Sequence, residues 1–211
     1  MSSLKQPPQL KPPDLWPPVG MSKKEHDGTK FLHATVMSLS HFVDAFAAAI
    51  ELYRFSLSKA PHVPAQTRFQ WKWFALHEGA MTIWHLRESL NLLPRRFGPC
   101  ATVVRLVNRQ AMQRAIDLFD KQHFPDFELV RDAIAHAPTI SLTMSDIVLD
   151  DGLLASPRIK DGDVYEVINR GKRYEFAMTE ETLRKVAEVV TTYWAAFAPV
   201  VKAFDQAGRS E

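Results

Sequence analysis

Long segments with apolar residues at helical spacing, separated by prolines, constrain the fold of this chain most strongly. Four such segments are present: residues 29–59, 65–93, 101–123 and 179–204. Proline pairs follow the first two of them, at Pro61 and Pro64 and again at Pro94 and Pro99. Proline fixes φ and removes a backbone N–H donor, so it ends helices. The pattern therefore predicts several long amphipathic helices that pack against one another.

Shorter, strand-like segments precede the last of these helices. The sequences DVYEVI and KRYEFA flank Asn169, Arg170 and Gly171, which is typical of a β-hairpin. Thr179 is suited to cap the next helix, and two glutamates follow it in the first turn. We therefore predict a mainly α protein: an up-and-down bundle of four to five helices, with a small β-hairpin inserted before the last helix.

The predicted domain boundaries follow from composition. Residues 1–28 contain three Pro-Pro pairs and few residues to bury, so we expect a disordered Pro-rich tail. Residues 29–211 are expected to form a single helical-bundle domain, with the β-hairpin insertion at about residues 140–178. With 46% hydrophobic residues, a chain of this length can bury a sizeable core.

Charge and cysteine usage limit the compartment and the partners. The formal net charge is only +2, so RNA binding would have to come from local patches. The chain has one cysteine, Cys100, so it has no internal disulfide and suits a reducing compartment. No continuous apolar run approaches the roughly 18 residues that span a membrane. We expect a cytoplasmic protein with no membrane partner.

Residues 124–138, FPDFELVRDAIAHAP, predict a short helix between two prolines. One apolar stripe is expected to face the core: Phe127, Val130 and Ile134. The polar residues are Arg131, Asp132 and His136, of which Asp132 and His136 are four apart and share a face. A guanidinium can hold a phosphate and an imidazole can move a proton, so this set suits a phosphodiester. The alternative is structural: Arg131 in a surface ion pair and His136 at a helix end.

The sequence RDAIAH, residues 131–136, resembles the R-polar-x-x-x-H signature of the HEPN superfamily. Its setting is similar too, because the motif follows two long helices and lies at a helix end. The resemblance implies a bundle that forms a homodimer and brings two motifs into one cleft, as a metal-independent endoribonuclease in toxin–antitoxin or phage defence. It assigns catalysis to Arg131, Asp132 and His136. Some members only bind, so a catalytically inactive binding module, recognising an antitoxin or regulator, is the second interpretation.

Further candidates lie outside this motif. Four arginines precede it and are weak candidates for RNA contact: Arg95, Arg96, Arg105 and Arg109. Arg105 and Arg109 are expected on one face of the third helix. Four aromatic residues form a dense cluster that either fills the core or stacks bases: Trp71, Trp73, Phe74 and Trp84.

Histidines suggest a metal site only weakly. His33 and His41 are eight residues apart, as are His77 and His85, which is about 12 Å of helical rise. That distance is too long for one pair to bind a single ion, and no HExxH or ExxH pattern is present. We therefore expect no metal and no cofactor, and keep a helical metal protein as a third interpretation.

Overall fold

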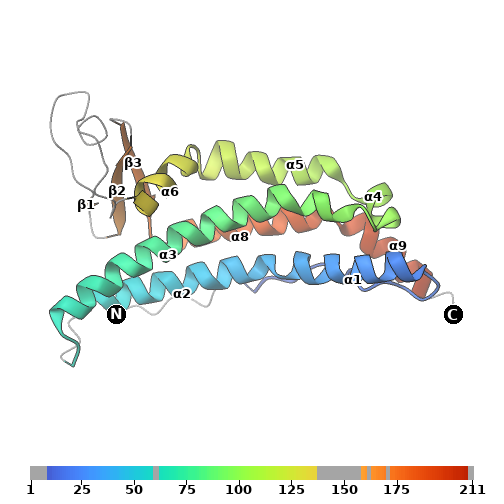
Figure 1. The fold of residues 1–211 in the computed structure, drawn as a ribbon, viewed down its shortest axis with the longest axis horizontal. Coiled ribbons are helices and arrows are strands. Elements are labelled where there is room, and N and C mark those ends of the chain that lie inside the picture. Colours follow the sequence, from blue (N-terminus) through green and yellow to red (C-terminus); the bar gives the residue numbers. More distant parts are fainter. Residues whose placement is uncertain (1–8, 59–61, 137–157, 161–162, 170–171, 209–211) are drawn as a thin grey trace. The chain divides into compact units, whose positions relative to one another are not determined.

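The computed structural model of the chain describes residues 9–58, 62–136, 158–160, 163–169 and 172–208 (Figure 1). It is a mainly helical bundle with a small antiparallel sheet before the last helices, as the sequence predicts. The helices, including the 3-10 helix η1 and the π-helix η2, are α1 Lys23–Met37, α2 Leu39–Leu57, α3 Ala65–Leu92, η1 Leu93–Phe97, α4 Ala101–Leu106, α5 Arg109–Asp117, η2 Leu118–His123, α6 Phe127–His136, α8 Glu180–Ala195 and α9 Ala198–Gly208. The strands are β1 Arg158–Lys160, β2 Val164–Asn169 and β3 Lys172–Ala177.

The described chain divides into two compact units. One contains residues 44–84 and the described part of 124–184, and the other contains residues 9–43, 85–123 and 185–208. The first unit therefore holds the α2–α3 connection, α6 and the sheet. The second holds α1, α4, α5, η2 and α9.

Aromatic side chains join α2, α6 and the sheet in the first unit. The ring of Phe176 on β3 lies 6.2 Å from that of Phe46 on α2 and 5.8 Å from that of Phe127 on α6. Gly79 of α3 lies against the same core, since a Cβ there would come within 2.7 Å of the sulfur of Met178. This core fixes α6, which carries the candidate motif, against the sheet.

The sheet has the order β1-β2-β3, and both pairings are antiparallel. In the register of β2 with β3, Val164 pairs with Ala177 and Asn169 with Lys172, so the predicted hairpin is confirmed. Thr179 caps the helix after it, because its Oγ1 accepts a hydrogen bond from the backbone N–H of Thr182. Residues 140–157 of the predicted insertion lie outside the described residues.

Polar atoms of buried aromatic residues connect helices in the second unit. Trp194 Nε1 donates to the carbonyl of Val36, and Tyr193 Oη donates to that of Leu90. Burial raises the pKa of Tyr193, which therefore stays a neutral donor. Gly28 permits a close approach of α1, since a Cβ there would lie 2.9 Å from the Pro99 ring.

The prediction of a disordered tail at residues 1–28 is wrong for residues 9–28. Helix α1 begins at Lys23 instead of Thr29, and Ser22 Oγ accepts a hydrogen bond from the Glu25 N–H. Before this helix, Leu15 is fully buried and its N–H donates to Nδ1 of His33. The buried Leu15 and its hydrogen bond to His33 thus attach the Pro-rich segment to α1.

The predicted third helix at residues 101–123 is wrong as one continuous helix. It breaks at Val107 and Asn108 into α4 and α5, and its last turn is the π-helix η2. The Asn108 side chain caps α5 by accepting from the Ala111 N–H, and its own N–H donates to the Ala196 carbonyl. Arg105 and Arg109 therefore lie on two different helices and do not share a helix face.

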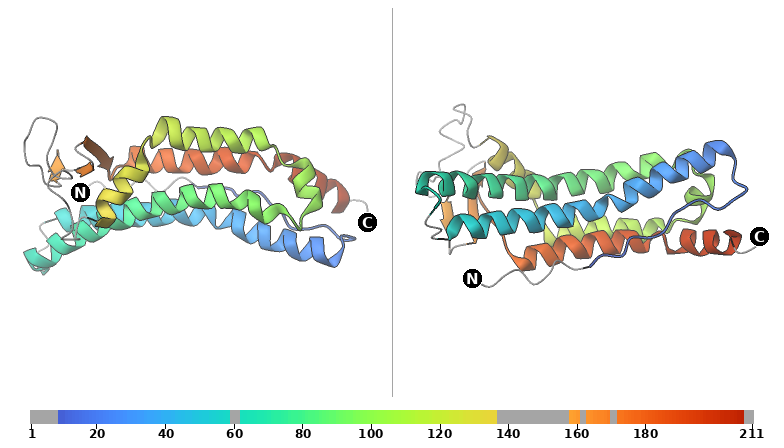
Figure 2. Two further views of the ribbon diagram at one scale, coloured as in Figure 1. Left: turned by 45° about the horizontal axis from the view of Figure 1, so that its top comes forward. Right: turned by 90° about the horizontal axis from the view of Figure 1, so that it is seen from below.

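Two other predicted helices contain breaks. Ser38 separates α1 from α2 within the predicted segment 29–59. The last predicted helix is divided into α8 and α9, with Pro199 at the second position of α9 (Figure 2).

One helical stretch in the described chain, Lys23–Leu57, is long and apolar enough to cross a membrane. It was not expected from the sequence. This is weak evidence, because a buried core helix meets the same criteria. Several of its apolar residues are core residues: Leu32, Val36, Val43, Phe46, Ile50 and Tyr53.

Candidate functional site

Helix α6 positions the candidate motif. Asp126 precedes α6 and has a φ of +57°. Its carbonyl accepts a hydrogen bond from the Leu129 N–H in the first turn of the helix. The predicted apolar stripe is confirmed, because Phe127, Val130 and Ile134 are all buried. The helix is therefore fixed on one side, and its polar residues lie on the remaining surface.

The Arg131 guanidinium is held by two groups within the first unit. Its carbon lies 4.4 Å from the ring centroid of Trp84 on α3, which is a cation–π contact. Its Nη1 lies 2.9 Å from Oδ1 of Asp132. The side chain is about one-quarter exposed (26%), and its buried Nε has no hydrogen-bond partner among the described residues.

This arrangement leaves a partly exposed, oriented cation with an unfilled donor. A guanidinium has five N–H groups in a fixed fork, and an aromatic ring beneath it does not compete for them. An anion with two oxygens, such as a phosphate or carboxylate, can approach only the exposed part of the guanidinium, because the unfilled Nε is buried. The aromatic contact from α3 was not predicted, because Trp84 and Arg131 are far apart in the sequence.

The predicted pairing of Asp132 with His136 stays a prediction. The described partner of the Asp132 carboxylate is Arg131. His136 is the last residue of α6, as predicted for a helix end, and its side chain lies outside the described residues. The structure thus brings Arg131, Asp132 and Trp84 together.

The four arginines predicted as weak RNA contacts are all exposed. Arg95 and Arg96 lie in η1, Arg105 lies in the last turn of α4, and Arg109 is the first residue of α5. All four belong to the second unit. Residues 89–116 contain these four and Arg114, but no lysine, aspartate or glutamate. We call these five residues the arginine surface. No acidic residue within this stretch of sequence balances their charge, although Glu25 of α1 interacts with Arg105.

A shallow pocket of about 240 Å³ lies beside part of this surface. It is lined by Pro94, Phe97, Arg109, Met112, Gln113 and Ile116. The mixture of apolar side chains with one arginine can hold a flat or apolar group next to an anion. Sequence reasoning did not predict this hollow, because it depends on the break between α4 and α5.

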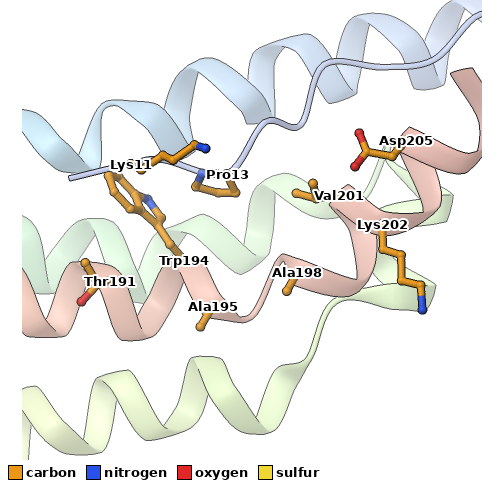
Figure 3. Close-up of a pocket in the computed structure, with 9 residues that line it drawn as sticks. All are labelled: Lys11, Pro13, Thr191, Trp194, Ala195, Ala198, Val201, Lys202 and Asp205. Carbon is orange, nitrogen blue, oxygen red and sulfur yellow. The ribbon is translucent and has the colours of Figure 1, made fainter. Parts of the chain in front are cut away.

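A larger pocket, of about 440 Å³, is formed where the Pro-rich segment crosses α8 and α9. In Figure 3, Lys11 and Pro13 lie beside the indole of Trp194, while the amine of Lys202 points away from it. The indole N–H is already used by the Val36 carbonyl. The pocket was not predicted, because the segment that lines it was assigned to a disordered tail.

A polar cluster on η2 was also missed. Asp120 accepts from Arg87 Nε at 2.7 Å, and His123 Nε2 lies 2.9 Å from Glu188 Oε2. These contacts connect η2 to α3 and α8 within the second unit. π-Helical turns are often found at functional sites, but the contacts seen here account for the cluster as a structural connection.

Comparison with known proteins adds no relative: no protein-family model, no curated protein and no solved structure matches this chain. The resemblance to the HEPN superfamily therefore rests on residues 131–136 and on the helical context alone.

Proposed function

We propose that this protein is a HEPN-type, metal-independent endoribonuclease that acts as a homodimer, in toxin–antitoxin or phage defence. The observation that carries the proposal is the Arg131 guanidinium, oriented by Trp84 and Asp132 on the helix that ends at His136. An oriented guanidinium and a histidine are two of the groups that cleavage of RNA by its own 2′-hydroxyl uses.

The proposed reaction needs only groups of the protein and the RNA. His136 accepts the proton of the 2′-hydroxyl, and the 2′ oxygen forms a bond to the adjacent phosphorus. The bond from phosphorus to the 5′ oxygen breaks, and that oxygen takes a proton from a second acid. The products are a cyclic phosphate and a free 5′-hydroxyl. Arg131 stabilises the charge that develops on the phosphoryl oxygens.

A second copy of the chain completes this proposed site. Arg131 and His136 are five residues apart, which is about 140° around an ideal helix. Within one helix they diverge, so the site requires that two copies of α6 face each other. The imidazole of one copy then serves as base, and that of the other supplies the proton to the leaving oxygen.

One observation favours a second candidate, a catalytically inactive binding module. Trp84 and Asp132 already engage Arg131, as they would in a purely structural role. In that case the bundle recognises a protein antitoxin or a regulator, and the guanidinium only supports α6.

The two candidates are separated by a cleavage assay on mixed-sequence RNA with a chelator present. We expect cleavage that requires the 2′-hydroxyl, a loss of about 10²–10⁴ in rate for His136→Ala and a loss of about 10²–10³ for Arg131→Lys. The matched control is His77→Ala, an exposed histidine on α3, which should cleave at the wild-type rate. Thermal unfolding of each variant distinguishes lost chemistry from lost structure.

Absence of cleavage by the wild-type dimer, together with unchanged cellular toxicity of His136→Ala, would leave the binding module as the better account. If Arg131→Lys loses cleavage and also has a lowered melting temperature, Arg131 has a structural role.

A further inference from the structure

The pocket beside the arginine surface is formed by one face of α5 together with η1. Four of its lining residues come from α5, at spacings of three and four: Arg109, Met112, Gln113 and Ile116. Residues at these spacings share a face of a helix. Two residues of η1 complete the lining: Pro94 and Phe97. We call this hollow the η1–α5 pocket, and all of its residues belong to the second unit.

The apolar part of the η1–α5 pocket is held in place by the core. Phe97 and Met112 are only 3% and 5% exposed, and the Phe97 ring packs edge to face on Phe197, with ring centroids 6.0 Å apart. The start of α5 is fixed as well, because the Asn108 N–H donates to the Ala196 carbonyl. The pocket is therefore preformed. Its volume of about 240 Å³ is below the roughly 300–1,000 Å³ of drug-sized sites, so it suits one small ring system.

Arg109 supplies this pocket with a free cation. Among the described residues, no hydrogen-bond or ion-pair partner holds its guanidinium. Two other members of the arginine surface are already engaged: Arg96 lies 5.6 Å from the ring centroid of Phe31, and Arg114 Nη2 donates to Gln110 Oε1. The Arg109 guanidinium can therefore bind the oxygens of an anion at the pocket.

Gln113 supplies a polar group to the same pocket. Its Nε2 donates to Asp117 Oδ1 at 3.0 Å, which orients the amide. Its Oε1 has no hydrogen-bond partner among the described residues, so it can accept from an amino group of a ligand. Asp117 is the acid closest to the pocket on α5, but Lys121 Nζ lies 3.1 Å from its carboxylate and balances its charge.

We propose that the η1–α5 pocket binds a nucleoside phosphate, with an amino-bearing base in the apolar hollow and the phosphate on Arg109. A planar heterocycle suits a hollow of this size, and a glutamine amide can accept from the exocyclic amine of adenine. An aromatic carboxylate would use Arg109 alone, whereas the other members of the arginine surface favour a phosphate or several phosphates. The ligand is a free nucleotide or one unit of single-stranded RNA, and in the second case the inference rests on the proposed function.

The test is calorimetric titration of the full chain with separate parts of the ligand. We expect adenosine 5′-monophosphate to bind, and adenosine or inorganic phosphate alone to bind at least about tenfold more weakly, because each lacks one set of contacts. Uridine 5′-monophosphate, whose base has no amino group, should bind about fivefold more weakly.

Substitutions in the pocket separate the two contacts. Arg109→Gln should lower the affinity for adenosine 5′-monophosphate at least about tenfold. Arg114→Gln, which makes the same change of charge on the same helix outside the pocket, should lose less, and Arg184→Gln on α8 should bind as the wild type does. Gln113→Leu should remove the preference for the adenine nucleotide over the uridine nucleotide. Melting temperatures show whether each variant is folded.

Competition identifies the source of the nucleotide. A short oligoadenylate that displaces adenosine 5′-monophosphate assigns the pocket to RNA, and one that does not displace it assigns the pocket to free nucleotides.

Three results would overturn the proposal. The first is no binding of adenosine 5′-monophosphate to the wild type. The second is inorganic phosphate binding as tightly as the nucleotide, which would leave only an anion site. The third is equal loss in Arg109→Gln and Arg114→Gln, which would show general electrostatic attraction. None of these results depends on cleavage, so a chain that binds nucleotides but cleaves no RNA keeps this inference and loses the proposed nuclease.

Discussion

Glu25, a single residue on α1, supplies a hydrogen bond that another helix lacks. The N-cap of α4 is Cys100, whose side chain makes no capping hydrogen bond. Glu25 Oε1 instead accepts from the Thr102 N–H at 2.7 Å. The Thr102 backbone, followed by its hydroxyl, lowers the pKa of Glu25; burial opposes this effect, and the charge of Arg105 adds to it. The carboxylate thus acts as a cap from a separate segment.

This contact predicts a pH-dependent effect of Glu25→Gln. The folded-state pKa of Glu25 lies below its unfolded value, so its stabilisation is present above the unfolded pKa and is lost as pH falls through the folded pKa. At neutral pH we expect the variant to lose about 1 kcal/mol or less, because the side chain is partly exposed. At acid pH the wild type and Glu25→Gln should have the same free energy of unfolding. Urea unfolding across pH measures this, with the exposed Glu78→Gln as control; a difference that does not change with pH would contradict the assignment.

For single residues, the sequence pattern predicted only which side of its own helix a residue occupies. The stripe of Phe127, Val130 and Ile134 was correct because helical periodicity determines it. The contacts of Arg131 with Trp84 and of Glu25 with Thr102 were missed, because each joins segments that are distant in sequence. Periodicity identifies which face of a helix is buried, but not which side chain lies opposite.

Among the elements, the Pro-rich segment before α1 departs most from expectation. Leu15 is fully buried, whereas Val19, four residues later, is 74% exposed. Trp16 packs edge to face on His33, with ring centroids 5.9 Å apart, and Lys30 lies 4.9 Å from the Trp16 ring centroid. The segment is therefore attached at Leu15 and Trp16, and composition alone could not predict this attachment, because it depends on a few individual side chains.

Truncation of that anchor tests the attachment. Leu15→Ala removes a fully buried side chain and should lower the free energy of unfolding by about 2–5 kcal/mol. Val19→Ala changes an exposed side chain of similar chemistry and should have an effect within about 0.5 kcal/mol. Equilibrium unfolding in urea measures both. Equal, small effects would show that the segment contributes nothing to stability.

The helices were predicted better than their ends. Apolar periodicity located the helical segments, and the turn residues located the hairpin. The division between α4 and α5 was missed, because residues 101–123 contain no proline or glycine to mark it. Asn108 produces the break through a cap and through a backbone hydrogen bond to Ala196 of a later element. Tertiary contact, rather than local preference, ends that helix.

In the whole molecule, net charge conceals how the charges are distributed. The total of +2 arises from 26 basic and 24 acidic residues, but residues 89–116 carry five arginines and no acid. This distribution of charge is visible only when several elements are considered together, because the arginines come from η1, α4 and α5. We propose the arginine surface as the RNA contact of the proposed nuclease, because residues 89–116 carry five arginines and no acidic residue.

A salt titration tests the arginine surface as the RNA contact of the proposed nuclease. Each arginine that neutralises a phosphate of single-stranded RNA steepens the slope of log K against log salt by about 0.7. Arg95→Gln with Arg109→Gln, in a His136→Ala background that keeps the RNA intact, should therefore reduce the slope by about 1.4. The control is Arg184→Gln on α8, a side chain that is 71% exposed but outside the surface. If the slope is unchanged in the double variant, the phosphates lie elsewhere, because counterion release depends on the contacts formed and not on the total charge.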